Sequence, residues 1–418
     1  MHERLFDLSV IQVSGALESH PCKFVSVRGP GTEGGVAALF AGIGGIEQGL
    51  RASGFEAELF CEAWAPAQSV LATRFPGRPI AGDVRELRSL PKVEVVTAGF
   101  PCQDLSQAGR TAGIDGERSG LVTEVFRLLR RRHPRWLVLE NVQFMLQLEG
   151  GRGMRYLIDS LEEMKYRWAY RVVDSRFTGV PQRRRRVMLV ASRTEDPREV
   201  LFADDAGDPK EDRYRNDVFG FYWTEGLRGL GWAIDAVPTI KGGSTIGIPS
   251  PPGVWVPSAA PGRRIVVPGI EDAEAMQGFE RGWTDCVPGR RELGTRWKLV
   301  GNAVTVGVSS WLGSRLREPG SVIVDESPLD ANAAWPTAAT GERGRVSRVH
   351  ASEYPRLGRY QHLSEVVDLS RSTALSRRAA SGFFSRAQRA KLRFDDQFLA
   401  DIAEHAENPA ELALPIPA

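Results

Sequence analysis

The 418-residue sequence has few residues that could build a disulfide framework or a metal site. It contains four cysteines and six histidines. Cys22, Cys61, Cys102 and Cys286 lie far apart, and none has the CxxC or Cys/His spacing typical of zinc sites. We therefore expect free thiols, a reducing compartment and no bound metal.

The sequence also lacks long apolar runs and an excess of charge of one sign. It has no apolar run of 18 residues and no signal peptide, so we expect a cytoplasmic protein without a membrane partner. The formal net charge is only +2, but arginine clusters at 127–135, 183–186 and 371–393. Such clusters are compatible with nucleic-acid binding and equally with solvated faces. Length and composition predict a globular protein of two or three domains.

One stretch combines a strand, a turn and a single cysteine. The β-branched run 93–97 predicts a buried strand, and Gly99 and Pro101 then form a turn that presents Cys102. In open α/β folds ligands bind at this carboxyl edge of the sheet. A lone cysteine is usually a buried structural residue, but the turn and the polar loop 103–120 favour a reactive thiol under a loop that can close.

A second stretch is rich in glycine. Residues 36–40 predict a strand, and the turn 41–45 (AGIGG) leads into a helix. This pattern is typical of the first turn of a Rossmann-like sheet and leaves open a dinucleotide, an adenosyl cofactor or a packing role. The next two predicted strands end in Glu62 and Asp83, which suit ribose hydroxyls and an adenine amino group unless they are surface acids.

Further charged residues follow later strands. Strand 136–139 brings Glu140 to the same edge as Cys102, where it could hold or share a proton or, alternatively, cap the following helix. Four arginines, 183–186, then lead into another strand. Because side chains alternate along a strand, Arg184 and Arg186 are expected on one face and the other two arginines on the opposite face.

GFPCQDLSQAG at 99–109, ENV at 140–142 and QRRRR at 182–186 together resemble the DNA (cytosine-5) methyltransferase family in order and spacing. The resemblance covers about residues 35–318. It implies an α/β fold: a Rossmann-like S-adenosylmethionine-dependent methyltransferase sheet, a smaller β-rich target-recognition domain and a C-terminal extension. The expected parts are an N-terminal extension (1–34), a catalytic domain (35–192), the recognition domain (193–265), a closing segment (266–318) and the C-terminal extension (319–418).

The resemblance implies S-adenosyl-L-methionine as cofactor, with Phe40 against the adenine, Glu62 on the ribose and Asp83 on the base. Two positions depart from the family pattern: Ala38 replaces a frequent acid, and Ala63 precedes Trp64, so either could line the adenine pocket. The implied cofactor-binding residues are Phe40, Ala41, Gly42, Gly44, Gly45, Glu62, Ala63, Asp83, Val84, Gly99, Pro101, Asn302, Ala303 and Val304.

The implied reaction is methyl transfer to C5 of a cytosine flipped out of a specific double-stranded DNA sequence, through a covalent Cys102–C6 adduct. Glu140 would act at N3, and Arg184 and Arg186 would hold Glu140 and the cytosine O2. The implied DNA-binding residues are Gln103, Ser106, Gln107, Arg110, Gln182 and Thr239.

The family implies a role in restriction-modification or phage defence, with a cognate nuclease or other defence proteins as partners. Two alternative functions stay open: an RNA (tRNA) cytosine-5 methyltransferase and a non-catalytic DNA-binding subunit. A nicotinamide dehydrogenase would explain the glycine turn but not the Pro-Cys turn. Region 193–265 could instead be a small β domain without base contacts, and 319–418 is either a DNA-contacting module or a packing arm.

Overall fold

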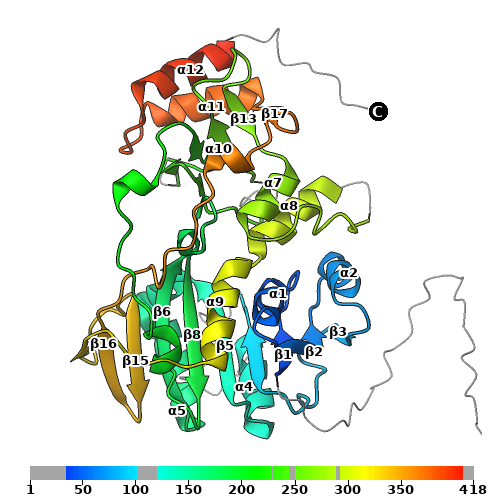
Figure 1. Ribbon diagram of the computed structural model, residues 1–418, viewed down its shortest axis with the longest axis vertical. Coiled ribbons are helices and arrows are strands. Elements are labelled where there is room, and N and C mark those ends of the chain that lie inside the picture. The colour runs from blue at the N-terminus through cyan, green and yellow to red at the C-terminus, as the bar shows by residue number, and fades with distance from the viewer. Residues whose placement is uncertain (1–33, 102–119, 228, 244–249, 289–291, 408–418) are drawn as a thin grey trace, which may run out of the picture. The chain divides into compact units, whose positions relative to one another are not determined.

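The computed structural model describes residues 34–101, 120–227, 229–243, 250–288 and 292–407, which form two β-sheets and a two-stranded ribbon (Figure 1). Within these residues the larger sheet has ten strands in the order β14-β16-β15-β6-β8-β5-β4-β1-β2-β3. The strands are β1 (Gly35–Leu39), β2 (Glu56–Cys61), β3 (Ile80–Ala81), β4 (Val95–Ala98), β5 (Trp136–Val142), β6 (Arg167–Asp174), β8 (Arg185–Ser192), β14 (Glu326–Pro328), β15 (Ala338–Glu342) and β16 (Arg345–Val349).

The half of this sheet from β5 to β3 is parallel, whereas β8, β6 and β15 join it in antiparallel pairs. Strands β1 and β4 are buried along their whole length, as small and β-branched residues are in a parallel sheet covered on both faces. The parallel strands share one carboxyl edge. The residues that follow β1, β2 and β4, together with those at the end of β5, therefore meet there.

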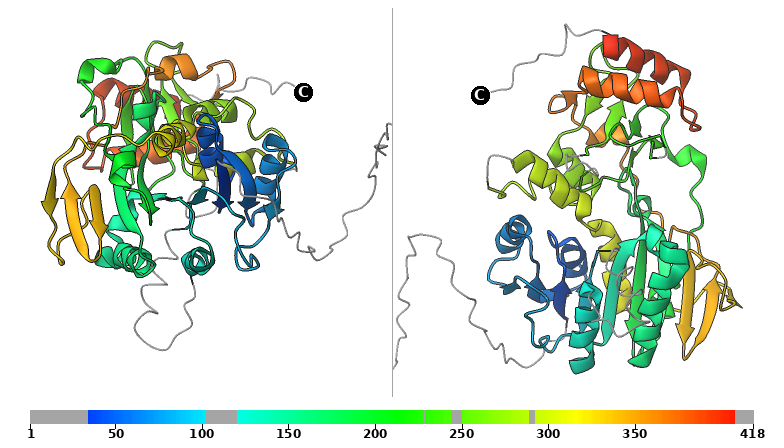
Figure 2. Two further views of the ribbon diagram at one scale, coloured as in Figure 1. Left: turned by 60° about the horizontal axis from the view of Figure 1, so that its bottom comes forward. Right: turned by 180° about the vertical axis from the view of Figure 1, so that it is seen from behind.

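Helices cover both faces of the larger sheet. Helices α1 (Gly45–Arg51) and α9 (Val306–Arg317) pack on one face, and α4 (Leu121–Arg131) and α5 (Arg152–Glu163) pack on the other (Figure 2). The arrangement confirms the predicted Rossmann-like α/β class.

The other helices are shorter or lie outside these two layers. No helix in the described ranges is long and apolar enough to cross a membrane. The remaining helices are α2 (Ala65–Arg74), η1 (Gln143–Leu146), η2 (Leu148–Gly151), η3 (Ser175–Thr178), α6 (Arg198–Leu201), η4 (Glu211–Arg213), α7 (Ile270–Met276), α8 (Glu292–Asn302), α10 (Leu363–Val366), α11 (Arg377–Ala387) and α12 (Asp396–Glu407).

The smaller sheet is antiparallel and has the order β10-β9-β12-β13-β17. Strands β9, β10 and β12 come from the region 193–265, where a β-rich domain of short strands is predicted, and β13 begins at its last residue. A separate ribbon pairs β7 with β11 in parallel. These strands are β7 (Gln182–Arg183), β9 (Phe219–Phe221), β10 (Trp232–Ile234), β11 (Val237–Pro238), β12 (Gly253–Trp255), β13 (Ile265–Val267) and β17 (Thr373–Ala374).

Residues from the predicted C-terminal extension contribute to both sheets. Strands β14 to β16 extend the larger sheet beyond β6, whereas β17 pairs with β13 of the smaller sheet. Helices α11 and α12 cover the smaller sheet, where Phe383 and Phe398 pack on Phe221. Of the two interpretations of this segment, the described residues show packing; DNA contact stays untested.

Asp235, in the loop that precedes β11, links this loop to the start of α10 and the residues before it by hydrogen bonds. It is fully buried and adopts a left-handed backbone conformation with φ of 52°. Its carboxylate accepts the backbone N–H of Leu363 at 2.8 Å and pairs with His362 Nδ1 at 2.6 Å. The hydroxyl of Tyr360 donates to the Asp235 carbonyl at 2.6 Å. The late part of the chain is therefore held to the smaller-sheet region before it reaches β17.

Candidate functional site

A cavity of about 530 Å³ lies at the carboxyl edge of the parallel strands. This volume is in the range of small-molecule sites. Twelve of the residues predicted from the sequence line it: Phe40, Gly42, Glu62, Ala63, Asp83, Val84, Gly99, Pro101, Glu140, Arg184, Arg186 and Asn302.

The glycine-rich turn forms one wall of the cavity. Phe40, directly after β1, has a positive φ of 56°, a strained conformation for a residue with a side chain. The N–H of Ala41 donates to the Cys61 carbonyl at 3.2 Å, which joins the turn to β2. This conformation is therefore supported by a hydrogen bond that the turn donates to the neighbouring strand.

Glu62 is fixed by two backbone groups. Its Oε2 accepts the N–H of Gly42 at 2.8 Å, and its Oε1 accepts the N–H of Trp64 at 2.8 Å. Each carboxylate oxygen has a further lone pair for a ligand hydroxyl. Ala63 and Trp64 both line the cavity, so the structure does not single out one of them.

Asp83 lies at the cavity with a cationic neighbour. Arg85 binds it through its backbone N–H at 2.9 Å and its Nε at 3.0 Å, and these hydrogen bonds lower the pKa of the Asp83 carboxyl. Asp83 therefore stays ionised as an acceptor. Val84 is buried beside it.

The acid of the ENV motif lies against the turn that leads to Cys102. Arg186 Nε pairs with Glu140 Oε1 at 2.9 Å. A Cβ atom on Gly99 would lie 3.4 Å from Glu140 Oε2, an ordinary van der Waals distance, so this carboxylate lies directly against the turn. The amide of Asn141 donates to the Phe100 carbonyl at 2.9 Å. The two motifs are therefore joined directly.

Cys102, Gln103, Ser106, Gln107 and Arg110 lie outside the described residues. Another thiol, Cys61, does line the cavity. Burial raises the pKa of the Cys61 thiol to about 12, which keeps it protonated and unreactive near neutral pH.

Arg184 and Arg186 point to the buried side of the strand, and Arg183 and Arg185 are exposed, as the alternation predicts. Arg184 binds backbone carbonyls rather than Glu140: those of Ile240 at 2.9 Å and Ala303 at 2.7 Å. Burial lowers its pKa, and the nearby Arg186 lowers it further. Arg184, which lines the cavity, thus links Ile240 to Ala303.

Gln182 makes a similar internal link. It is fully buried; its amide donates to the Met276 carbonyl at 3.0 Å and accepts the N–H of Ile240 at 2.9 Å. Its described contacts are therefore within the protein. Thr239 donates to the Arg183 carbonyl at 2.8 Å and lines a second cavity of about 360 Å³ with Trp232.

The remaining predicted cofactor-binding residues lie behind the residues that line the cavity. Ala41, Gly44, Gly45, Ala303 and Val304 are not among the residues that line the described cavity. A Cβ atom on Gly45 would come within 2.4 Å of the Val304 carbonyl oxygen. The closing segment and the glycine turn are thus in direct backbone contact.

Five apolar lining residues are missing from the predicted set: Ala67, Phe100, Leu121, Val142 and Leu299. Phe100 stands inside a motif and could have been included, whereas nothing in the local pattern marks the two leucines. In the described ranges no group of three or more His, Cys, Asp or Glu side chains could hold a metal ion.

Comparison with known proteins gives matches along most of the chain. A family model described as C-5 cytosine-specific DNA methylase matches residues 35–224. The Type II methyltransferase M2.BsuMI of Bacillus subtilis (strain 168) is 45% identical over 377 residues, which cover 87% of this chain and 96% of that protein. M.BanI of Aneurinibacillus aneurinilyticus, also a Type II methyltransferase, is 35% identical over 190 residues, 44% of each chain.

Among solved structures, the S. pombe Dnmt2 methyltransferase aligns with a TM-score of 0.50 and 15% identity. The alignment covers 68% of this chain and 98% of that one. At this identity the likeness concerns the fold alone.

Proposed function

Because the chain belongs to the C-5 cytosine-specific DNA methylase family, we propose that it methylates C5 of a flipped cytosine within one short double-stranded DNA sequence, through a covalent bond from Cys102 to C6. It is a DNA methyltransferase of the type II restriction-modification kind. One observation carries the mechanistic proposal: the turn before Cys102 and the Glu140–Arg186 pair meet at one cavity.

The family implies S-adenosylmethionine, and the residues at the cavity fit it. Glu62 offers free lone pairs on a carboxylate that Gly42 and Trp64 hold in place, and Phe40 lines the same cavity. Asp83, kept ionised by Arg85, offers further acceptor oxygens for an amino group. When bound, this cofactor supplies the methyl group.

Cytosine C5 is a weak nucleophile, and addition of a thiolate at C6 turns it into an enamine-like carbon. Cys102 is the residue for this step, because Pro101 lies at the cavity and Asn141 fixes Phe100. Glu140 holds a proton at N3 as charge develops there, and Arg186 fixes the carboxylate. After C5 is methylated, H5 leaves as a proton, the S–C6 bond breaks and the thiolate is restored.

The two atoms that react are enclosed in duplex DNA, so the base must leave the stack to enter the cavity. Arg184 acts here by positioning: it ties the segment beside Thr239 to the cavity wall. Thr239, Arg183 and Trp232 surround the second cavity and are the described candidates for contact with the DNA. The biological role we propose is host-DNA protection beside a cognate nuclease.

Bisulfite sequencing of plasmid DNA from cells that express the chain tests the proposal. We expect protected cytosines in one short sequence context with the wild type, none with Cys102→Ala, and full protection with Cys286→Ala, a matched cysteine change outside the cavity. Protection by Cys102→Ala would contradict the covalent mechanism. If the wild type protected no cytosine, RNA would become the substrate to test.

A further inference from the structure

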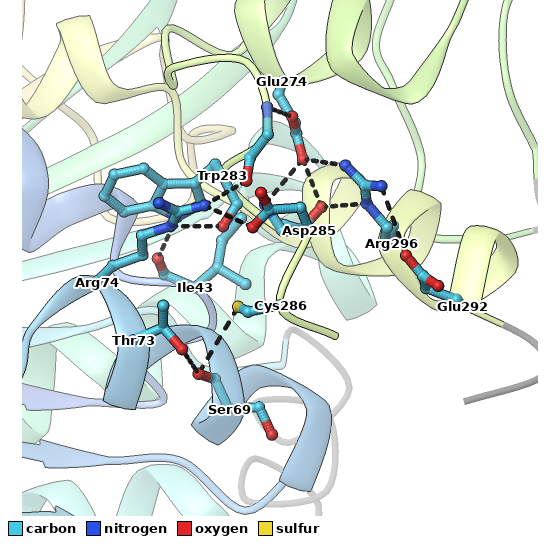
Figure 3. Close-up of polar contacts among 12 residues, drawn as sticks. Ile43, Ser69, Thr73, Arg74, Glu274, Trp283, Asp285, Cys286, Glu292 and Arg296 are labelled. Carbon is cyan, nitrogen blue, oxygen red and sulfur yellow. Dashed lines mark hydrogen bonds and ion pairs between the residues drawn. The ribbon is translucent and has the colours of Figure 1, made fainter. Parts of the chain in front are cut away.

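A polar network joins the closing segment to the helix that follows the Glu62 strand end (Figure 3). Arg74 of α2 donates from Nε to the Trp283 carbonyl at 2.8 Å and pairs with Asp285 at 2.9 Å. Its guanidinium lies over the Trp283 ring, 5.2 Å from the ring centre. Trp283 is therefore held from one side by α2.

The indole of Trp283 reaches the glycine-rich turn itself. The side chain is 4% exposed, and its Nε1 donates to the carbonyl of Ile43 at 3.1 Å. Ile43 is the middle residue of the turn 41–45. The Trp283 ring also packs on Phe75 and Phe279. The turn thus receives a hydrogen bond from a residue far along the chain.

Two glycines of the turn lie in close contact with the aromatic rings that pack on Trp283. A Cβ atom on Gly44 would come within 2.4 Å of the Phe75 ring, and one on Gly45 within 3.2 Å of the Phe279 ring. Phe40 and Gly42 line the cavity on the inner side. The turn is therefore enclosed between the cavity and the aromatic residues outside it.

The position of Trp283 is fixed by a buried acid. Glu274 of α7 is fully buried and accepts the N–H of Gly282 at 2.6 Å and that of Thr284 at 2.9 Å. Arg296 of α8 donates to the same carboxylate at 3.2 Å. Leu299, Gly301 and Asn302 at the end of α8 line the cavity. The closing segment therefore contributes residues to the cavity itself and, through Trp283, supports the outer side of the turn.

We propose that Trp283 is a positioning residue for the cofactor: its indole N–H holds the Ile43 carbonyl and keeps the turn 41–45 in the shape that accepts the ligand. The identity of the ligand rests on the proposed function. The claim that Trp283 fixes the turn is independent of the proposed function, because it is argued only from contacts between protein groups. The two claims can therefore fail separately.

Trp283→Phe tests this, since phenylalanine keeps an aromatic ring but has no N–H. Trp168→Phe is the matched control. Trp168 lies on β6 and is fully buried, its Nε1 donates to Glu162 of α5 at 2.8 Å, and it does not line the cavity. Amide hydrogen exchange of residues 40–46 in the ligand-free chain is measured first. We expect at least tenfold faster exchange of these amides in Trp283→Phe and no change in Trp168→Phe.

The second measurement is the affinity for S-adenosylmethionine by titration calorimetry, with kcat at saturating cofactor. We expect about tenfold weaker binding for Trp283→Phe and kcat within twofold of the wild type. Unchanged exchange in the turn, or equal effects in both variants, would overturn the positioning role. If the wild type bound no S-adenosylmethionine, the proposed cofactor would fail, while the exchange result would still decide whether Trp283 fixes the turn.

Discussion

At the scale of single residues, Glu47 is an acid buried between a helix and the larger sheet. It lies in the first turn of α1, is 3% exposed, and its Oε1 accepts the hydroxyl of Thr97 on β4 at 2.6 Å. Burial raises the pKa of this carboxyl from an ordinary value of 4.5 to about 7. Ala38 on β1 pairs with Thr97, the partner of this acid, in the sheet.

The raised pKa of Glu47 predicts a pH-dependent stability. Between pH 4.5 and 7 the folded state keeps a proton that the unfolded state has lost, so the free energy of unfolding falls as the pH rises through this range. This loss is about 3 kcal/mol by pH 8, since each pKa unit corresponds to 1.36 kcal/mol. Glu47→Gln should remove this part of the slope, which urea unfolding at pH 5 and pH 8 measures. Equal slopes in the two proteins would contradict it.

Several predicted motif residues line the cavity, but their partners were not predictable from the sequence. Alternation along the strand correctly predicted that Arg184 and Arg186 share a face. Arg184, however, binds carbonyls 56 and 119 residues away, and Glu47 binds a hydroxyl 50 residues away. Carbonyl groups carry no sequence signal, because every residue has one, so contacts of this kind come only from the three-dimensional structure.

At the scale of elements, long periodic segments were predictable and very short strands were not. The apolar spacing in 121–129 predicted α4, and strand 136–139 became the start of β5. By contrast, β17 has two residues, Thr373 and Ala374, and exists because Ala374 pairs with Val266 more than a hundred positions earlier. A strand of this length is defined by its partner rather than by its own composition.

Helix α12 contributes an aromatic side chain to the core of the smaller sheet. Phe398 is fully buried, with its ring 4.8 Å from that of Trp232 and 5.0 Å from that of Phe221. Phe398→Ala should lower the free energy of unfolding by about 3–5 kcal/mol. Leu392→Ala, at a residue 39% exposed, should have little effect. Denaturant unfolding followed by tryptophan fluorescence compares them; similar losses would show that α12 is not part of this core.

At the scale of the whole molecule, the cavity is built without the last part of the described chain, whereas the smaller sheet includes it. The cavity is lined by residues between 40 and 302, whereas the smaller sheet needs β17 and the two helices that follow it. We infer that the smaller sheet contributes to recognition of the DNA sequence. A chain that stops after Ser372 should then keep its affinity for S-adenosylmethionine and lose sequence-specific DNA binding. Calorimetry and gel-shift assays with target DNA measure both; unchanged DNA binding would contradict the dependence on β17.

The place of β17 in the smaller sheet has a consequence for biosynthesis. A growing chain has made every residue that lines the cavity once Asn302 has been added, yet β17, which pairs with the free edge of β13, is still to come. Synthesis proceeds at about 5–20 residues per second, so several seconds separate the two events. Translation thus makes every residue of the cavity lining before it makes the last strand of the smaller sheet.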